Sequence, residues 1–142
     1  MAVSSDVKAA ALAAVPLFAG ISGESMARLA QAAGELEFSD GQFIVRQGQV
    51  GTGLYLIMSG AVRVLRGSDE IARLGPGDFF GELSVIDQEP RNASVQATGS
   101  TACLALASWD LLSLLETDRA LSLNMIRGLV ARVRSAGEQH RH

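Results

Sequence analysis

The feature that most constrains the fold is the middle section, residues 35–107, in which hydrophobic and polar residues alternate in short runs between glycines. A period of two predicts β-strands, because successive side chains of a strand point to opposite faces of a sheet. The runs lie at 36–38, 43–45, 54–58, 61–65, 71–74, 93–97 and 102–106. No helix-length crossover separates them, which excludes a parallel sheet and predicts antiparallel neighbours joined by tight turns.

The residues before this section have the three-to-four-residue spacing of amphipathic helices. Residues 4–33 are rich in alanine, and the pattern breaks between Pro16 and Gly23. We therefore expect two short N-terminal helices. Ser22, followed three positions later by a second serine, is the expected start of the second helix.

The residues after the middle section return to helical spacing at Ser108. A short helix and a longer one are predicted, with Asp118 as the cap of the longer helix and Gly137 at its end. Trp109 is expected in the core beneath these helices, because large aromatic side chains are mostly buried.

The order of these patterns predicts one α+β domain over residues 1–142. Its expected parts are N-terminal helices in 1–34, an antiparallel β-roll or jelly-roll-like barrel in 35–107, and two C-terminal helices in 108–137. No repeat, low-complexity linker or second domain is visible in the sequence.

Composition narrows the functions that such a roll could serve. The formal net charge of −3 offers no general attraction to nucleic acid or acidic membranes, so we expect neither as a partner. The single Cys103 lies in an apolar run and is expected to be a buried thiol in a reducing, cytoplasmic compartment.

The histidines, His140 and His142, lie in the polar tail, which argues against a metal site and against haem or cupin-type chemistry on the strands. No nucleophile has a base partner, so we expect no enzyme and no cofactor.

The segment 81–95 interrupts the strand pattern and contains the residues that indicate a ligand. Gly81 leads into a short helical stretch, where free backbone N–H groups would face an anion. Arg91 follows Pro90 and offers a planar, permanent cation suited to two phosphate oxygens, while Glu82 can accept a hydrogen bond from a sugar hydroxyl. The alternative is a structural ion pair between Glu82 and Arg91. An isolated buried pair seldom recovers its desolvation cost, which favours ligand binding.

The segments 81–84 (GELS) and 90–95 (PRNASV) resemble the phosphate-binding cassette of the cyclic-nucleotide-binding domain family. Further matches lie at 15–18 (VPLF), Gly48, 54–57 (LYLI) with Ser59 and Gly60, and 75–80 (GPGDFF), so that the resemblance covers nearly the whole chain. The fold it implies is a β-roll with helices before it and two helices after it, the last of which is a lid over the base. The function it implies is a regulatory sensor that binds a 3′,5′-cyclic mononucleotide, with cAMP favoured over cGMP, and performs no reaction on it.

The resemblance also implies a role for each cassette residue. Glu82 would bind the ribose 2′-hydroxyl and Arg91 the cyclic phosphate, while backbone N–H groups of Ser84 and Asn92 would complete the phosphate cradle. Asn92 stands where the family commonly has Ala, Ser or Thr, so its amide could read the base and the choice between cAMP and cGMP stays open. The expected ligand site is Gly81, Glu82, Leu83, Ser84, Arg91, Asn92 and Ala93, with Arg127, Arg132 and Arg134 of the last helix as candidates to stack on the base.

The last predicted helix carries apolar residues on two faces. One face can cover the site and the roll, whereas the other requires a partner, either a second copy of the chain or an effector protein. The alternative function is a roll that no longer responds to a ligand and acts as a protein-interaction module. Some family members continue into a DNA-binding domain; because this chain stops at His142, we expect no DNA partner. On the last predicted helix, one apolar face consists of residues 121, 125, 129 and 133, and the other consists of residues 123, 126 and 130.

Overall fold

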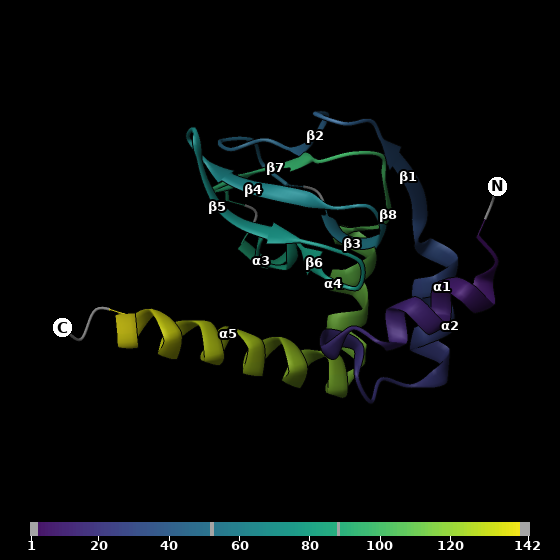
Figure 1. The fold of residues 1–142 in the computed structure, drawn as a ribbon. Coiled ribbons are helices and arrows are strands. Elements are labelled where there is room, and N and C mark those ends of the chain that lie inside the picture. The colour runs from purple at the N-terminus through teal and green to yellow at the C-terminus, as the bar shows by residue number, and fades with distance from the viewer. Residues whose placement is uncertain (1–2, 52, 88, 140–142) are drawn as a thin grey trace.

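The computed structural model describes residues 3–51, 53–87 and 89–139, and its elements follow the order helix, strand, helix (Figure 1). The N-terminal part holds α1 (Ser5–Ala13), the 3-10 helix η1 (Pro16–Phe18) and α2 (Gly23–Ala32), which begins after Ser22 as expected. The strands are β1 (Gly34–Phe38), β2 (Phe43–Val45), β3 (Gly53–Ser59), β4 (Val62–Arg66), β5 (Asp69–Leu74), β6 (Phe79–Phe80), β7 (Ser94–Ala97) and β8 (Thr101–Ala107). The remaining helices are α3 (Glu82–Asp87), α4 (Ser108–Thr117) and α5 (Arg119–Gln139). This order confirms the α+β class.

Two four-stranded antiparallel sheets form the roll, with strand orders β1-β8-β3-β6 and β2-β7-β4-β5. Each run of period-two residues became a strand, and the pairing is antiparallel throughout the described ladders. The β-roll is therefore confirmed, but the barrel closure is wrong. The two sheets are separate, and each ends in two edge strands, β1 and β6 in one and β2 and β5 in the other.

The strand β6 is the one described strand that the sequence pattern did not predict, because two residues show no alternation. Phe79 and Phe80 pair with Leu56 and Tyr55 of β3. The Phe80 ring stacks on the Tyr55 ring, with centroids 5.2 Å apart and an interplanar angle of 16°. This pairing fixes the chain beside β3 immediately before α3.

The core has two parts. One lies where α1, α2, α4 and the start of α5 pack on the sheet that contains β3 and β8; its largest buried members include Leu12, Phe18, Leu29, Leu104, Leu111 and Leu121. The other lies between the two sheets and contains Val45, Ile57, Val62, Val95 and Cys103. Cys103 is 1% exposed, and burial raises the pKa of its thiol to about 11. The expectation of a buried thiol is therefore confirmed.

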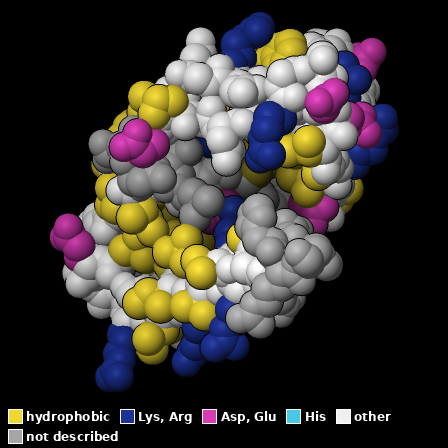
Figure 2. Space-filling model, turned by 90° about the vertical axis from the view of Figure 1, so that its left-hand side faces the viewer, with side chains coloured by type: hydrophobic (Ala, Val, Ile, Leu, Met, Phe, Trp, Pro, Cys, Tyr) yellow, Lys and Arg dark blue, Asp and Glu magenta, His cyan; other side chains and the backbone are white. Residues whose placement is uncertain are grey.

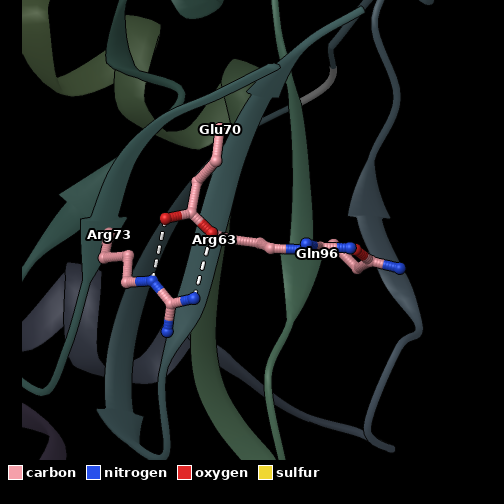
Figure 3. A network of polar contacts seen from close by, with 4 residues as sticks. All are labelled: Arg63, Glu70, Arg73 and Gln96. Atoms are coloured by element: carbon pink, nitrogen blue, oxygen red, sulfur yellow. Dashed lines mark hydrogen bonds and ion pairs between the residues drawn. The ribbon is translucent and has the colours of Figure 1, made fainter. Parts of the chain in front are cut away.

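The sheet that contains β4 also carries a network of polar side chains (Figure 3). Arg63 Nε on β4 donates to Gln96 Oε1 on β7 at 2.7 Å, and Arg73 on β5 donates to both carboxylate oxygens of Glu70 at 2.9 and 3.0 Å. The Arg73 and Glu70 side chains are 66% and 36% exposed, so water screens their attraction and the pair adds little stability. We assign these contacts to the sheet surface.

Trp109 lies outside the core, contrary to the expectation, and is 69% exposed. The inward face of α4 is occupied by Leu111 and Leu114, which are 0% and 2% exposed. A helix turns by about 100° per residue, so Trp109 lies about 200° from Leu111 and points to solvent. Its position in the helix outweighs the general preference of tryptophan for the interior.

The start of α5 is joined to the N-terminal helices by Asp118. The N–H of Leu121 donates to Asp118 Oδ1 at 3.1 Å, which is the predicted cap, and the N–H of Ser22 donates to Oδ2 at 3.2 Å. A hydrogen bond from the Ser25 hydroxyl and those from backbone N–H groups hold the pKa of Asp118 below its usual value. One carboxylate therefore caps α5 and binds the N–H of Ser22, the residue whose side chain caps α2.

Asn124 makes a second connection between α5 and the N-terminal part. Its Nδ2 donates to the carbonyl oxygens of Leu17 and Ala19, at 3.0 and 2.7 Å. Since both acceptors belong to η1 and its C-terminal end, the first turns of α5 are fixed against this segment.

Beyond Met125, most apolar side chains of α5 are exposed. Leu121 and Met125 are buried, but the following apolar residues Ile126, Val130 and Val133 are 54%, 45% and 71% exposed. Val133 shares the predicted face of Leu121 and Met125 but not their burial, because 21 residues span about 30 Å and the helix extends beyond the core that packs on its start (Figure 1). The helix also continues to Gln139, because Gly137 does not adopt the left-handed conformation of a helix-ending glycine.

Candidate ligand-binding site

Arg91 is held in the roll through both its backbone and its side chain. Its N–H donates to the carbonyl of Gln49 at 2.8 Å, and its own carbonyl accepts from the N–H of Gly48 at 2.8 Å. Its Nη2 donates to the carbonyl of Gly53 at 3.0 Å. The residue is 9% exposed, and burial lowers the pKa of the guanidinium, which nevertheless stays protonated in the physiological range. A fixed, partly desolvated cation therefore lies inside the roll.

Gly81 turns the chain from β6 into α3. Its φ of +95° lies in the left-handed region, which glycine adopts without the steric strain of other residues. The turn brings Glu82, the first residue of α3, to a position where it is 7% exposed. Its Oε1 accepts a hydrogen bond from Nη2 of Arg132 on α5, whose side chain is 58% exposed. The ion pair that the structure gives for Glu82 is therefore with Arg132, and it joins the cassette to the last helix.

A cavity of about 350 Å³ contains these groups, within the size range of small-molecule sites. Its lining combines residues of the cassette and α5 with apolar side chains of both sheets. The first group comprises Gly81, Glu82, Glu89, Pro90, Arg91, Asn92, Ala93 and Arg132. The apolar side chains are those of Val45, Val64, Leu74, Phe79, Phe80 and Val95. Such a lining suits a ligand with a charged part and a flat apolar part.

A second cavity of about 350 Å³ adjoins the first on the side of α5, and the two share Phe79, Glu82 and Arg132. It lies between η1 and α5, with Leu17 and Met125 among its apolar lining residues. Figure 2 shows the molecule from the side to which α5 extends, and hydrophobic side chains gather in the lower part of this face. α5 therefore forms one wall of a space that continues into the cassette.

The structure brings most of the predicted site residues together. Gly81, Glu82, Arg91, Asn92 and Ala93 line the first cavity, with Asn92 exposed at its rim. The side chains of Leu83 and Ser84 lie outside the described residues. Of the three arginines of the last helix, Arg132 lines both cavities and Arg127 the second, whereas Arg134 is absent from the described lining of either one.

Sequence reasoning missed the apolar lining of the cavity and the glycines that surround Arg91. Val64, Leu74 and Phe79 come from strands and their ends, so nothing in a period-two pattern separates them from ordinary core residues. Gly51 and Gly53 did carry a signal, because two glycines at the start of a strand indicate a close approach of another group.

In the part of the chain that the structure describes, no three His, Cys, Asp or Glu side chains are grouped so that they could hold a metal ion. The helices of that part include none that is long and apolar enough to cross a membrane.

Comparison with known proteins identifies a family for most of the roll. The sequence model of the family described as "Cyclic nucleotide-binding domain" matches residues 35–118, which is more than half of the chain and includes the whole cassette. Among curated proteins, the Cyclic AMP receptor protein of Thermus thermophilus is 36% identical over 126 residues, covering 85% of this chain. The cAMP-dependent protein kinase type II regulatory subunit of Drosophila melanogaster is 37% identical over 98 residues, covering 66% of this chain. The chain spans 58% and 26% of the lengths of these two relatives.

A solved structure supports the same assignment. The Catabolite Activator Protein of Thermus thermophilus superposes with a TM-score of 0.77 at 35% sequence identity. The match covers 87% of this chain and 61% of that protein, so it includes the helices on both sides of the roll.

Proposed function

The chain belongs to the cyclic nucleotide-binding domain family, and on this premise we propose that it binds a 3′,5′-cyclic mononucleotide, with cAMP favoured over cGMP, as a regulatory sensor module. The observation that carries the proposal is the cavity whose lining combines Arg91 and Glu82 with apolar side chains of both sheets. The names of the two curated relatives, a cyclic AMP receptor and a regulatory subunit of a cAMP-dependent kinase, support the preference for cAMP.

The chemistry of the cavity matches the parts of such a ligand. The cyclic phosphate carries one negative charge, and Arg91 supplies a planar cation whose position is fixed by the backbone around it. The ribose 2′-hydroxyl is a donor, and the carboxylate of Glu82 is an acceptor. The base is flat and largely apolar at its faces, which suits Val64, Leu74 and Phe79. In this role Arg91 and Glu82 bind and orient the nucleotide and perform no reaction on it.

Calorimetric titration with cAMP, cGMP and 5′-AMP tests the proposal directly. We expect saturable heat with cAMP, weaker binding of cGMP, and much weaker binding of 5′-AMP, whose extra charge and open phosphate do not match a site with one fixed cation. Thermal unfolding with and without each nucleotide provides an independent measurement, because a ligand that binds only the folded state raises the unfolding temperature. Absence of both heat and stabilisation at millimolar cAMP would contradict the proposal and favour an interaction module.

Asn92 is the residue through which we propose that the base is read. It is exposed at the rim of the cavity, and its amide can both donate and accept a hydrogen bond. Asn92→Ala is therefore expected to change the ratio of cAMP to cGMP affinity while phosphate binding persists. An unchanged ratio would assign the selectivity to α5 instead.

The second candidate function is a protein-interaction module, and the exposed apolar residues of α5 favour it. Ile126, Val130 and Val133 recur at three- and four-residue spacing, so they form one stripe on the helix. We propose a second copy of the chain or an effector protein as the partner of this stripe, in addition to nucleotide binding. Light scattering and amide exchange over residues 119–136, each with and without cAMP, test it. A monomer with identical exchange in both conditions would contradict a switch in α5 and leave nucleotide binding intact.

A further inference from the structure

Three glycines surround the guanidinium of Arg91. A Cβ atom on Gly51 would overlap Nη2, Cζ and Nε of Arg91 at once, at distances that real Cβ atoms essentially never show. A Cβ atom on Gly81 would lie 2.8 Å from Nη1 of Arg91 and 2.6 Å from the carbonyl oxygen of Gly53. That carbonyl in turn accepts the hydrogen bond from Nη2. The guanidinium is therefore enclosed by main chain on several sides.

The three glycines differ in what a side chain would disturb. At Gly53 a Cβ would overlap the carbonyl of Leu106, which belongs to the paired strand β8, so the sheet itself would have to move. At Gly81 the φ of +95° makes any side chain strained, whatever space is available. At Gly51 the nearest atoms all belong to the Arg91 side chain, and the backbone conformation is not of the left-handed kind. Gly51 is thus the position where an added methyl group acts on Arg91 and spares the sheet.

We propose that Gly51 is a positioning residue for Arg91: the absence of a side chain at Gly51 sets where the guanidinium lies in the cavity. Because the overlap involves three atoms of a rigid planar group, rotating the tip of the arginine cannot relieve it. The whole guanidinium must shift, but the carbonyl of Gly53 and the backbone of Gly81 limit where it can go. The consequence for a phosphate ligand rests on the proposed function, whereas the effect on Arg91 itself does not.

A double-mutant cycle on the ligand-free protein tests the positioning role. The variants are Gly51→Ala, Arg91→Ala and the double substitution, compared by urea denaturation. We expect Gly51→Ala to lower the urea midpoint in the wild-type background and to leave it unchanged in the Arg91→Ala background, where the overlapping atoms are gone. Gly34→Ala is the matched control, because a Cβ there meets nothing within 4 Å, and its effect should be the same in both backgrounds. If the single Gly51→Ala variant does not fold but the double variant does, the proposal is supported. Equal effects of Gly51→Ala in both backgrounds would overturn it.

Titration with cAMP gives the second measurement. We expect Gly51→Ala to weaken cAMP binding by about tenfold or more, and to have no further effect once Arg91 is Ala. Wild-type affinity in a folded Gly51→Ala protein would overturn the proposal. A wild-type protein that binds no nucleotide but still shows coupling in urea would contradict the proposed function while supporting the role of Gly51, so the two failures are distinguishable.

Discussion

Two arginines line the first cavity of this protein, and the fold holds them in different ways. Arg91 is fixed by its own backbone hydrogen bonds to Gly48 and Gln49 and by the carbonyl of Gly53, and only 9% of the residue is exposed. Arg132 comes from the last helix, its side chain is 58% exposed, and it meets the cassette through Glu82. The roll alone therefore places the first cation, whereas the second depends on where α5 lies.

The difference suggests separate roles for the two cations. A buried, prearranged cation provides affinity, because little side-chain freedom remains to be lost on binding. An exposed cation on a helix that is anchored at one end can respond to the binding of a ligand in the cavity. The experiments below test this division, from the largest expected effect to the smallest.

Replacing Arg91 tests the fixed cation. Arg91→Ala should reduce cAMP affinity by about 2–5 kcal/mol, the range for removing one partner of a buried charge contact, and Arg91→Lys should restore only part of it. Calorimetric titration measures the loss, and thermal unfolding checks that the variant folds. Unchanged affinity would mean that Arg91 does not bind the phosphate.

Replacing Asn124 tests the anchor of the helix that carries Arg132. Asn124→Ala removes two hydrogen bonds to the carbonyls of Leu17 and Ala19, and we expect the free energy of unfolding to fall by about 1–3 kcal/mol. Amide exchange over α5 should become faster, while exchange in β3 and β8 should change less. Ser135→Ala, on the exposed end of the same helix, is the matched control. Equal exchange in Asn124→Ala and the control would show that Asn124 is not an anchor.

Replacing Arg132 tests the cation that α5 supplies. If its guanidinium stacks on the base, Arg132→Ala should weaken cAMP binding by about 0.5–2 kcal/mol, the range of a cation–π contact. Arg134→Ala is the matched control, since Arg134 is absent from the described lining of both cavities, and it should bind cAMP like the wild type. A loss for Arg132→Ala as large as that for Arg91→Ala would remove the distinction between the two cations.

Acidification tests the role of the Asp118 carboxylate, which caps α5 and binds the N–H of Ser22 at the start of α2. The pKa of Asp118 is lowered in the fold, so its contribution to stability is present above the unfolded pKa of about 3.9 and is lost as the pH falls through the folded pKa. Asp118→Asn should therefore change the free energy of unfolding by less than about 1 kcal/mol at pH 7, because asparagine also caps helices. Below about pH 4 the variant should lose less stability than the wild type does. Urea denaturation at pH 3, 5 and 7 measures both effects, and parallel pH profiles would contradict this role of Asp118.

The sequence allowed the fold to be predicted wherever a periodic pattern was long enough. The period-two runs and the helical segments gave the order of elements, and Ser22 and Asp118 were identified as caps from residue type and position alone. β6 escaped because Phe79 and Phe80 are too few to show alternation. Trp109 was misplaced because burial preference was applied without its angle relative to Leu111.

The candidate site was predictable where it consists of neighbours in the chain. Glu82 and Arg91 lie within one short segment and meet in one cavity. The glycines around the guanidinium and the apolar residues of the cavity lining come from distant segments, and only the strand pairing of the roll brings them into the same cavity region as Arg91. Among the three arginines of α5, the choice of Arg132 depended on where the helix lies across the roll, which helical spacing does not determine.

The hydrogen bond between Ser22 and Asp118 has a consequence for the order in which the protein can form during its synthesis. The two residues are 96 positions apart, so α2 is synthesised long before the carboxylate that binds the N–H of its capping residue. Chain growth proceeds from the N-terminus at about 5–20 residues per second, which separates the synthesis of the two residues by about five to twenty seconds. The contact that joins the start of α2 to the start of α5 can therefore form only after the whole roll has been made.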